Sequence, residues 1–334
     1  MGLVVVTGVA GFLGSHVADA YLAKGWQVRG IDNLLGGSAD NVPAGVEFYN
    51  HDLDYLEAIS PVFVGADLVI HAACTAYEGL SVFSPSLVVR NTVQISVNAM
   101  TASIQARVPK FVYMSSMARY GDNNGILFDE SLTPKPQDPY GIAKLSAEKL
   151  LSNLAEVHNV DLVILVPHNI VGGRQKFDDP FRNVASIMAN RMLQGKQPII
   201  YGDGSQQRCF SFIQDVIAPI LVACESEEAV GEVINIGPDE SPITILNLAE
   251  RLADIIGFEL EPTFVLGRPQ EVAVALCSSD KARKLLNYET SISLQDGLVD
   301  LVDWIRPRVK EFEYHLPIEI QSDLTPKTWT QRLI

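Results

Sequence analysis

Short apolar runs alternate with segments of helical periodicity through the first half of the chain. The runs are rich in β-branched residues and bounded by glycine or polar residues, as buried strands are. They occupy residues 3–7, 27–32, 46–50, 66–72, 110–115 and 162–167. Apolar positions recur at helical spacing over residues 11–24, 87–106 and 140–158. This alternation predicts parallel βαβ units, and therefore an α/β fold with a doubly wound, Rossmann-like parallel sheet.

A glycine-rich turn follows the first apolar run. Gly8, Gly11 and Gly14 lie where glycine lets backbone amides approach a pyrophosphate at the positive end of the next helix. Asp32 ends the second run, about twenty residues later, where a carboxylate binds an adenosine ribose and repels a 2′-phosphate. The chain is therefore predicted to bind a dinucleotide, with NAD favoured over NADP. A plain glycine turn and a solvated aspartate are the alternatives.

The pattern changes after Pro167. Turn-rich segments at 202–204 and 237–239 and a helical stretch at 183–194 predict a smaller substrate-binding lobe. Residues 215–225 and 232–236 have the pattern of a helix and a strand that return to the first sheet. We expect an NAD-binding domain at 1–170 with return of 210–236, a discontinuous lobe at 171–209 and 237–320, and a tail of unassigned role at 321–334.

Composition narrows the classes of function. The chain has 334 residues, 47% hydrophobic and 19% charged, which is typical of a globular protein with a sizeable core. Its net charge of −15 would repel nucleic acid and anionic lipid, so neither is expected as a partner. No apolar stretch is long enough to cross a bilayer, and the first strand leaves no room for a signal peptide, so a cytoplasmic protein is expected.

Tyr140 and Lys144 are the candidates for acid–base chemistry. They lie four residues apart, so on a helix the phenol and the ammonium share a face. A neighbouring cation and a positively charged nicotinamide would both lower the pKa of the phenol from about 10 towards neutrality. Ser115 and Ser116 follow the strand at 110–115, where one hydroxyl could relay a proton and the other cap the strand. A packed tyrosine and a solvated lysine on an ordinary amphipathic helix have the same spacing.

Taken together, the glycine turn, the strand-end Ser116 and the Tyr140/Lys144 pair resemble the extended short-chain dehydrogenase/reductase superfamily, in its nucleotide-sugar epimerase/dehydratase branch. The resemblance covers nearly the whole chain. It includes Asp32-Asn33-Leu34, Asp52-Leu53, His71-Ala72-Ala73, Pro139-Tyr140-Gly141, Asn169, the run from Gly202 to Arg208, and Arg268-Pro269.

This resemblance implies roles for individual residues. Ser116, Tyr140 and Lys144 would be catalytic, and Ser116, Asn169, Arg208 and Arg268 would bind a nucleotide-sugar, with the two arginines on its diphosphate. The residues expected to contact NAD are Gly8, Gly11, Phe12, Leu13, Gly14, Asp32, Asn33, Asp52, Leu53, Ala73, Tyr140, Lys144 and Pro167. The family also implies a homodimer, joined through the helices at 87–106 and 140–158. The position of a further cofactor-contacting asparagine near Asn91-Thr92 is ambiguous.

The residues after Ser116 favour one reaction of this branch. Dehydratases and decarboxylases usually carry an acidic residue shortly after the catalytic hydroxyl, whereas Met117-Ala118-Arg119-Tyr120 contains no carboxylate. The leading hypothesis is therefore an NAD-dependent 4-epimerase of a UDP-sugar that works through a transient 4-keto intermediate. Val166, Gly173 and Cys209 depart from residues common in relatives, so the sugar is less well defined than the fold.

Three alternatives stay open. A dehydratase or exo-glycal-forming relative would release a keto or unsaturated sugar, and an NAD-linked alcohol dehydrogenase or reductase would change NADH stoichiometrically without needing Arg208 and Arg268. A non-catalytic NAD-binding module would not need Ser116, Tyr140 and Lys144.

The cysteines and histidines are dispersed along the chain. Cys74, Cys209, Cys224 and Cys277 lack the paired spacing of zinc sites or disulfide frameworks, so they are expected to be buried small hydrophobic residues. The six histidines show no ligand spacing, and no metal site is expected. His168, beside Asn169, is expected to be structural rather than part of the sugar pocket.

Overall fold

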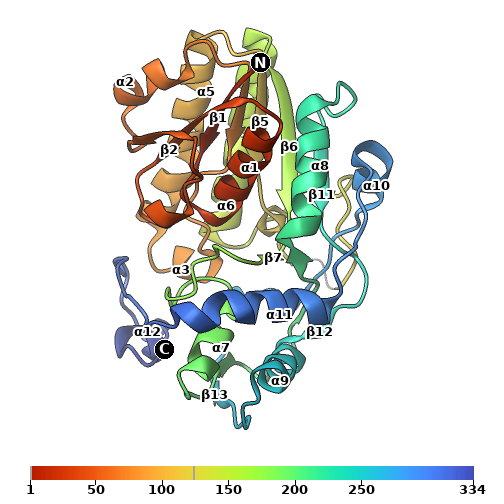
Figure 1. The fold of residues 1–334 in the computed structure, drawn as a ribbon. Helices are drawn as coiled ribbons and strands as arrows, with labels where there is room; N and C mark the ends of the chain where they lie inside the picture. The colour runs from red at the N-terminus through yellow and green to blue at the C-terminus, as the bar shows by residue number, and fades with distance from the viewer. Residues whose placement is uncertain (1, 123–124) are drawn as a thin grey trace.

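A seven-stranded parallel sheet forms the centre of the protein (Figure 1). The computed structural model describes residues 2–122 and 125–334. The strand order is β11-β6-β5-β4-β1-β2-β3, and every neighbouring pair is parallel. The sequence prediction of an α/β, Rossmann-like doubly wound sheet is therefore confirmed.

The structure contains short strands and mostly longer helices, with these bounds. The strands are β1 (Leu3–Thr7), β2 (Gln27–Asp32), β3 (Glu47–Asn50), β4 (Leu68–His71), β5 (Lys110–Met114), β6 (Asp161–Pro167), β7 (Ile170–Val171), β8 (Ile199–Tyr201), β9 (Gln207–Arg208), β10 (Ser211–Phe212), β11 (Val233–Ile236), β12 (Ile243–Thr244), β13 (Thr263–Val265) and β14 (Val274–Ala275). The helices are α1 (Phe12–Ala23), α2 (Leu56–Ile59), α3 (Glu78–Ser81), α4 (Pro85–Val89), α5 (Ile95–Gln105), α6 (Pro139–His158), α7 (Val184–Leu193), α8 (Ile213–Glu225), α9 (Ile245–Ile256), α10 (Asp280–Leu286), α11 (Leu294–Ile305) and α12 (Lys327–Thr330). None of these helices is long and apolar enough to cross a membrane, a statement that covers the described residues.

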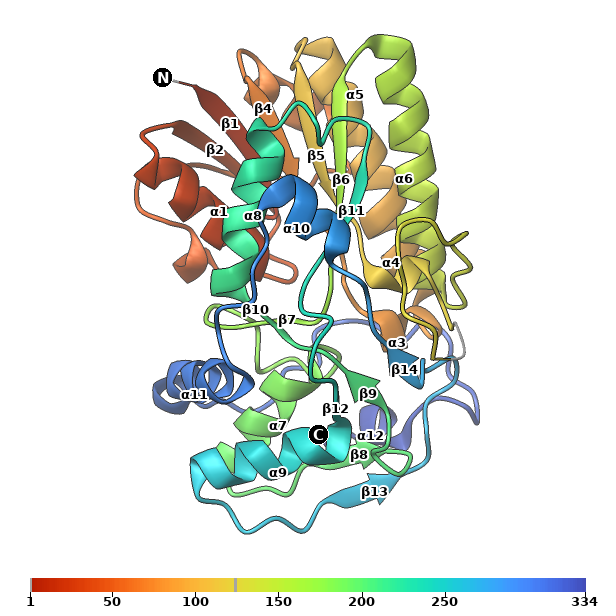
Figure 2. The ribbon, with the colours of Figure 1, turned by 90° about the vertical axis from the view of Figure 1, so that its right-hand side faces the viewer.

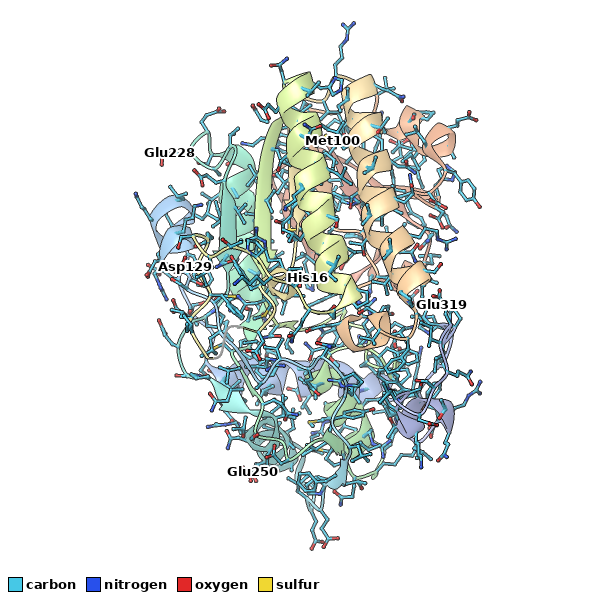
Figure 3. The ribbon with its side chains drawn as sticks, turned by 180° about the vertical axis from the view of Figure 1, so that it is seen from behind. His16, Met100, Asp129, Glu228, Glu250 and Glu319 are labelled. Carbon is cyan, nitrogen blue, oxygen red and sulfur yellow. The ribbon has the colours of Figure 1, made fainter. Side chains whose placement is uncertain are left out.

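Helices cover both faces of the central sheet, because strand side chains alternate between the two faces. Val5 packs in one core, with residues of α5 and α6. Its neighbours Val4 and Val6 pack in the other core, with residues of α1, α8 and α10. Figure 2 shows α1, α8 and α10 on one side of the sheet and α5 and α6 on the other, and Figure 3 views the molecule from the α5/α6 side.

A smaller lobe lies below the carboxyl ends of the central strands (Figure 1). Its core is made by residues of α7, α9 and α11, together with strand residues such as Ile200. Three short sheets belong to this half of the molecule: β13 with β8, β12 and β14 on either side of β9, and β10 with β7. β11 returns from this region and pairs with β6 at the edge of the central sheet.

Two segments pack differently from the expected domain division. Residues 280–286 fall within the expected lobe, yet α10 packs on the central-sheet core through Ala282 and Leu286. The tail, which had no assigned role, contributes Trp329 to a cluster with Tyr77 and Phe181. Its terminal Ile334 reaches the large cavity described below.

The helix predicted at 87–106 is interrupted. α4 ends at Val89, a π-helical turn spans Arg90–Gln94, and α5 continues from Ile95. Asn91 has non-helical dihedral angles within this turn. A π-turn inserts one extra residue into the helical repeat, so an unbroken 3.6-residue period could not place this segment correctly.

A buried ion pair fixes the turn after β5 against α6. The Arg119 guanidinium lies 2.9 Å from a carboxylate oxygen of Glu148, and both side chains are almost fully buried. The other Glu148 oxygen accepts a hydrogen bond from the Ser115 hydroxyl. Ser115 is therefore held by α6, and the next residue, Ser116, is placed by this network.

We expect Glu148→Ala to lower the free energy of unfolding by about 3–5 kcal/mol, because it leaves the Arg119 charge buried without a partner. Urea denaturation followed by circular dichroism would measure the loss. Glu156→Ala is the matched control, since Glu156 is exposed on the same helix, and its effect should stay within about 0.5 kcal/mol. Equal stability of the two variants would contradict the assignment.

Candidate active site

One cavity of about 470 Å³ lies between the carboxyl ends of the central strands and the smaller lobe. The residues predicted from the sequence to bind cofactor or substrate, or to act in catalysis, all line it. They are Gly8, Gly11, Phe12, Leu13, Gly14, Asp32, Asn33, Asp52, Leu53, Ala73, Ser116, Tyr140, Lys144, Pro167, Asn169, Arg208 and Arg268. The structure thus brings together segments that are far apart in the sequence, while their individual roles remain predictions.

The glycine turn forms a close-packed cradle at one end of the cavity. A Cβ atom on Gly14 would lie 2.2 Å from the carbonyl oxygen of Gly8, and Gly8 has a φ of +72°, so side chains are disfavoured at both positions. α1 begins directly after Gly11, and no described side chain accepts a hydrogen bond from its first turn. The amides at this positive helix end suit the diphosphate of a dinucleotide, so the cradle fits NAD.

Asp32 lies beside this cradle at the end of β2. Its carboxylate accepts hydrogen bonds from the amides of Ala10, at 3.0 Å, and Leu34, at 2.7 Å. Burial raises the pKa of Asp32, and these two amide donors oppose that effect. Asn33 donates to the Asp52 carboxylate at 3.0 Å. The end of the cavity next to β2 and β3 is therefore acidic and rich in acceptors, as a ribose site without a 2′-phosphate requires.

Ser115 and Ser116 have different surroundings. Ser115 is buried and donates to Glu148, so it has the structural role. The oxygen of Ser116 accepts a hydrogen bond from the Ala118 amide at 3.2 Å, and its hydroxyl is close enough to Tyr140 to interact with the phenol and favour the phenolate. Of the two serines, Ser116 is the one whose hydroxyl interacts with Tyr140 at the cavity wall.

Asp138 places Tyr140 at the start of α6. Its carboxylate caps the helix by accepting hydrogen bonds from the amides of Tyr140, at 2.9 Å, and Gly141, at 3.0 Å. One turn later the Lys144 ammonium donates to the carbonyl of Met114 at 2.7 Å and lies 5.9 Å from the centre of the Tyr140 ring. The phenol and the ammonium share a helix face, as their spacing predicts.

The electrostatics of Tyr140 differ from the sequence expectation. Burial raises the pKa of the phenol above its ordinary value, and the Lys144 charge and the Ser116 hydroxyl only partly offset this effect. Burial also acts to lower the pKa of Lys144, but the Coulombic influence of the Cys74, Tyr113 and Tyr140 side chains outweighs it, and the pKa of the ammonium is raised. The protein alone therefore keeps Lys144 charged and Tyr140 protonated, so a base near neutral pH needs a further positive charge beside the phenol.

Arg208 and Arg268 line the lobe side of the cavity. Arg208 is held by backbone carbonyls, donating to those of Gln207 and Val272 at 2.8 Å each. Arg268 lies over the Tyr201 ring, 4.6 Å from its centre, and pairs with Glu271 at 2.9 Å. These anchored guanidinium groups can bind phosphate oxygens, which explains how an acidic chain could hold an anionic ligand.

Asn169 also has a structural partner. Its side-chain amide donates to the carbonyl of Cys209 at 2.9 Å, and its φ of +44° lies in the left-handed region that asparagine tolerates. The amide nitrogen thus fixes the segment after β9, while the residue still borders the cavity.

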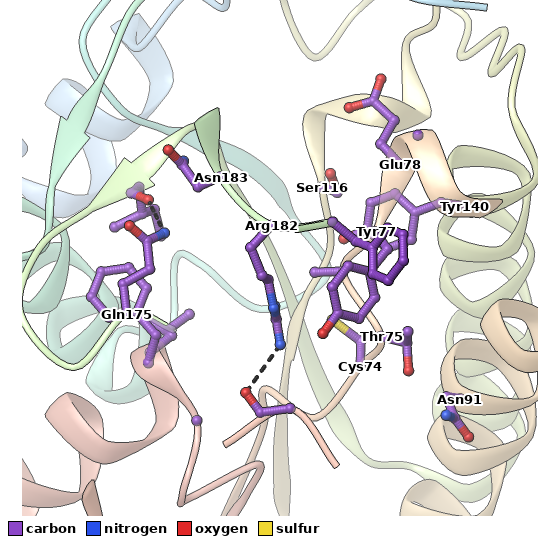
Figure 4. A pocket seen from close by; sticks show the side chains of 18 of the residues that line it. Cys74, Thr75, Tyr77, Glu78, Asn91, Ser116, Tyr140, Gln175, Arg182 and Asn183 are labelled. Carbon is purple, nitrogen blue, oxygen red and sulfur yellow. Dashed lines mark hydrogen bonds between the residues drawn. The ribbon is translucent and has the colours of Figure 1, made fainter. Parts of the chain in front are cut away.

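Several cavity residues were not found from the sequence. Arg182 lies 4.4 Å over the ring of Tyr77 and donates to the carbonyl of Gly36 at 3.1 Å, which links the lobe to the loop after β2 (Figure 4). Glu78 lies on the same wall as Ser116 and Tyr140. Asn91 borders the cavity from the π-turn, and its side-chain nitrogen is buried without a hydrogen-bond partner among the described residues. The only sequence signal for Asn91 was that a cofactor-contacting asparagine of the family falls near Asn91-Thr92, at a position that could not be assigned to one residue.

The cysteines and histidines largely follow their predictions. Cys209, Cys224 and Cys277 are buried, but Cys74 is half-buried and lines the cavity, so the expectation of a buried core residue is wrong for it. It follows β4, whose carboxyl end opens onto the cavity. His168 is buried and bonded to the carbonyl of Pro238 at 3.0 Å, as a structural histidine should be. His71 lies between Thr7 and Ser96, and burial lowers its pKa to about 3, so it is neutral.

Comparisons with known proteins agree with this geometry. Residues 4–237 match the model of the family described as "NAD dependent epimerase/dehydratase family". A putative UDP-glucose 4-epimerase of Methanocaldococcus jannaschii is 31% identical over 310 residues, covering 91% of this chain and 98% of that protein.

Solved structures show the same similarity. The UDP-glucose 4-epimerase of Thermotoga maritima, crystallised with UDP-glucose, has a TM-score of 0.86 and 31% identity, covering 92% of this chain and 100% of that one. The UDP-glucuronic acid 4-epimerase of Bacillus cereus, in complex with UDP-glucuronic acid and NAD, has a TM-score of 0.85 and 30% identity, covering 91% and 99%.

We expect the phenol of Tyr140 to remain protonated from about pH 6 to about pH 9 in protein freed of dinucleotide, because burial raises its pKa above about 10. The ultraviolet difference titration between wild type and Tyr140→Phe should show no phenolate in that range. Added NAD should bring a titration into the range, since a positive charge favours the phenolate. A phenol that titrates near neutral pH without NAD would contradict the role of burial.

Proposed function

The chain belongs to the NAD-dependent epimerase/dehydratase family, and we propose that within this family it is a nucleotide-sugar 4-epimerase that acts on a UDP-sugar. The main support is one juxtaposition. Ser116, Tyr140 and Lys144 share a single cavity with the anchored arginines Arg208 and Arg268 and with an uncapped helix end. A base, a hydroxyl relay, a diphosphate site and a dinucleotide cradle are the parts that 4-epimerisation requires.

In this proposal Arg208 and Arg268 bind the sugar diphosphate and thereby direct the sugar towards β5 and α6. Ser116 donates a hydrogen bond to Tyr140 and accepts one from the sugar 4-hydroxyl, so the proton of that hydroxyl can pass to the phenolate. Lys144 stabilises the phenolate and lies where a nicotinamide ribose would be held. NAD, when bound, supplies a reversible hydride acceptor at the sugar carbon that carries this hydroxyl.

The same residues return the proton in the second half of the cycle. A 4-keto sugar that rotates between the two steps presents its other face, and Tyr140 then returns through Ser116 the proton that it accepted in the first step, which forms the new hydroxyl. The diphosphate contacts of Arg208 and Arg268 need not break during this rotation. Burial of Tyr140 serves the cycle, because it excludes water from the reactive carbonyl.

The alternative reactions account less well for the residues that line the cavity. In the turn after Ser116, where dehydratases of this family usually carry an acidic residue, this chain has no carboxylate, and the charge of its Arg119 is already paired with Glu148. A dehydrogenase of a simple alcohol would have no use for Arg208 and Arg268. A module that only binds NAD would not need Ser116, Tyr140 and Lys144 together on one wall.

Incubation with UDP-sugars, without added reductant, should give a mixture of 4-epimers and no net NADH. Tyr140→Phe should lower kcat by about 10²–10⁴-fold, because it removes the general base while preserving the ring. Resolution of the products by nuclear magnetic resonance would measure both results.

Tyr21→Phe is the matched control, since Tyr21 is a buried tyrosine that packs on the far face of the sheet. It should retain turnover, and both variants should keep the wild-type fold by circular dichroism. Full turnover by Tyr140→Phe would overturn the mechanism, and a keto or unsaturated sugar as the end product would favour elimination.

We also infer a homodimer formed through α6 and the neighbouring α4. Ile142, Leu150 and Val157 are apolar and exposed on α6, at spacings that place them on one helix face, and Val89 is exposed on α4. An exposed apolar stripe on a long helix suits a helical bundle between two copies of the chain.

Leu150→Asp should convert the dimer to a monomer, because it would bury a charge in the apolar seam. Light scattering coupled to size-exclusion chromatography would give the mass. Leu266→Asp is the control, since Leu266 is 92% exposed on the smaller lobe and its replacement should leave the mass unchanged. A monomeric wild-type protein would refute the interface.

A further inference from the structure

Glu78 places a carboxylate in the cavity that the proposed chemistry does not use. It begins α3, and its side chain is exposed on the cavity wall near Ser116 and Tyr140 (Figure 4). It also borders an adjoining pocket of about 90 Å³, together with Ser116 and Arg208. Within the part of the chain that the structure describes, no group forms a hydrogen bond or an ion pair with the Glu78 side chain.

The position of Glu78 corresponds to the sugar portion of the ligand. The relay hydroxyl of Ser116 marks where the sugar 4-hydroxyl would lie, and Arg208 marks the diphosphate. Glu78 borders both cavities together with these two residues, so a ligand that contacts Ser116 and Arg208 occupies space that Glu78 also faces. Gly79, which follows, leaves room for Arg268, whose guanidinium would be 3.0 Å from a Cβ atom at that position.

The charges around Glu78 become more negative when a diphosphate binds. Arg208 and Arg268 are the nearby cations, and Asp138 and Glu271 are the nearby anions. The side chain is accessible from the cavity, but the surrounding protein displaces much of its water, and this loss of solvation first, and the Asp138 charge second, raise the pKa of Glu78 to about 7 against the influence of the two arginines. Once phosphate oxygens bind to those arginines, less positive charge is left to stabilise the ionised Glu78 carboxylate.

The other cations of the described cavity wall are already engaged. Lys144 donates to the Met114 carbonyl and lies beside Tyr140. Arg182 donates to the Gly36 carbonyl and lies 3.7 Å from the Asp179 carboxylate. The carboxylate of a uronate sugar would therefore lie near the Glu78 carboxylate, and no unpaired cation of the described cavity wall would be there to bind it.

We propose that Glu78 is a specificity-determining residue, which makes the sugar subsite select an uncharged sugar over one that carries a carboxylate. As an acceptor Glu78 can bind sugar hydroxyls, and as an anion it repels a uronate. This inference rests on the proposed 4-epimerase function, and it names the substrate class of that same site. It also separates two classes of relative that resemble this chain equally well, the UDP-glucose and the UDP-glucuronate 4-epimerases.

The test compares kcat/KM for UDP-glucose and UDP-glucuronate, with the NAD-loaded protein at about pH 9, which lies well above the pKa of about 7 that Glu78 has in the empty site and allows for its rise when phosphate binds. Wild type should prefer UDP-glucose by about tenfold or more, and Glu78→Gln should reduce that preference by a similar factor, mainly through better use of UDP-glucuronate. Glu57→Gln, which neutralises an exposed carboxylate on α2, should leave the preference unchanged.

Affinity for UDP alone, measured by calorimetry, should be no weaker in Glu78→Gln than in wild type, since the arginines stay in place and a nearby negative charge is removed. If the variant fails to fold, the wild-type preference can be followed from about pH 9 to about pH 6, over which protonation of Glu78 should weaken it.

Equal use of the two sugars by wild type, or an unchanged preference in Glu78→Gln, would overturn the role of Glu78 and leave the epimerase proposal standing. A wild-type protein that epimerises no UDP-sugar would overturn the proposed function itself, and this inference with it.

Discussion

The carboxyl ends of parallel strands meet at one edge of a sheet, and this constraint organises the rest of the protein. Each of six consecutive strands ends at or just before a residue that lines the cavity. From β1 to β6 these residues are Gly8, Asp32, Asp52, Ala73, Ser116 and Pro167. The smaller lobe brings Arg208 and Arg268 to the side of the cavity that faces this edge.

Much of this arrangement could be predicted because its signals are local. A buried parallel strand is apolar on both faces, so β1, β4, β5 and β6 appear as uninterrupted runs, and the residue after each run must lie at the sheet edge. Knowledge of that edge was sufficient to assign Ser116 and Asp32 to one cavity. The phenol and ammonium of α6 followed from helical spacing alone.

The features that sequence reasoning missed depend on long-range packing. Glu78 begins a single helical turn, and only the folded chain shows that it borders the same pockets as Ser116. Arg182 acquires its surroundings from Tyr77, which is more than a hundred residues earlier in the chain. The direction of the Tyr140 pKa depends on how much protein surrounds the phenol, and spacing carries no information on that.

The ion pair between Arg119 and Glu148 has a consequence for how defects in this protein would appear. Because it connects the turn that carries Ser116 to the helix that carries Tyr140, the relative placement of the two hydroxyl groups depends on a contact of the folded core. A molecule that keeps this contact has both groups in position, and one that loses it carries a buried, unpaired charge that makes the fold much less stable. Substitutions that weaken the core should then lower the fraction of folded, active molecules in a sample, while the turnover rate of each folded molecule stays the same.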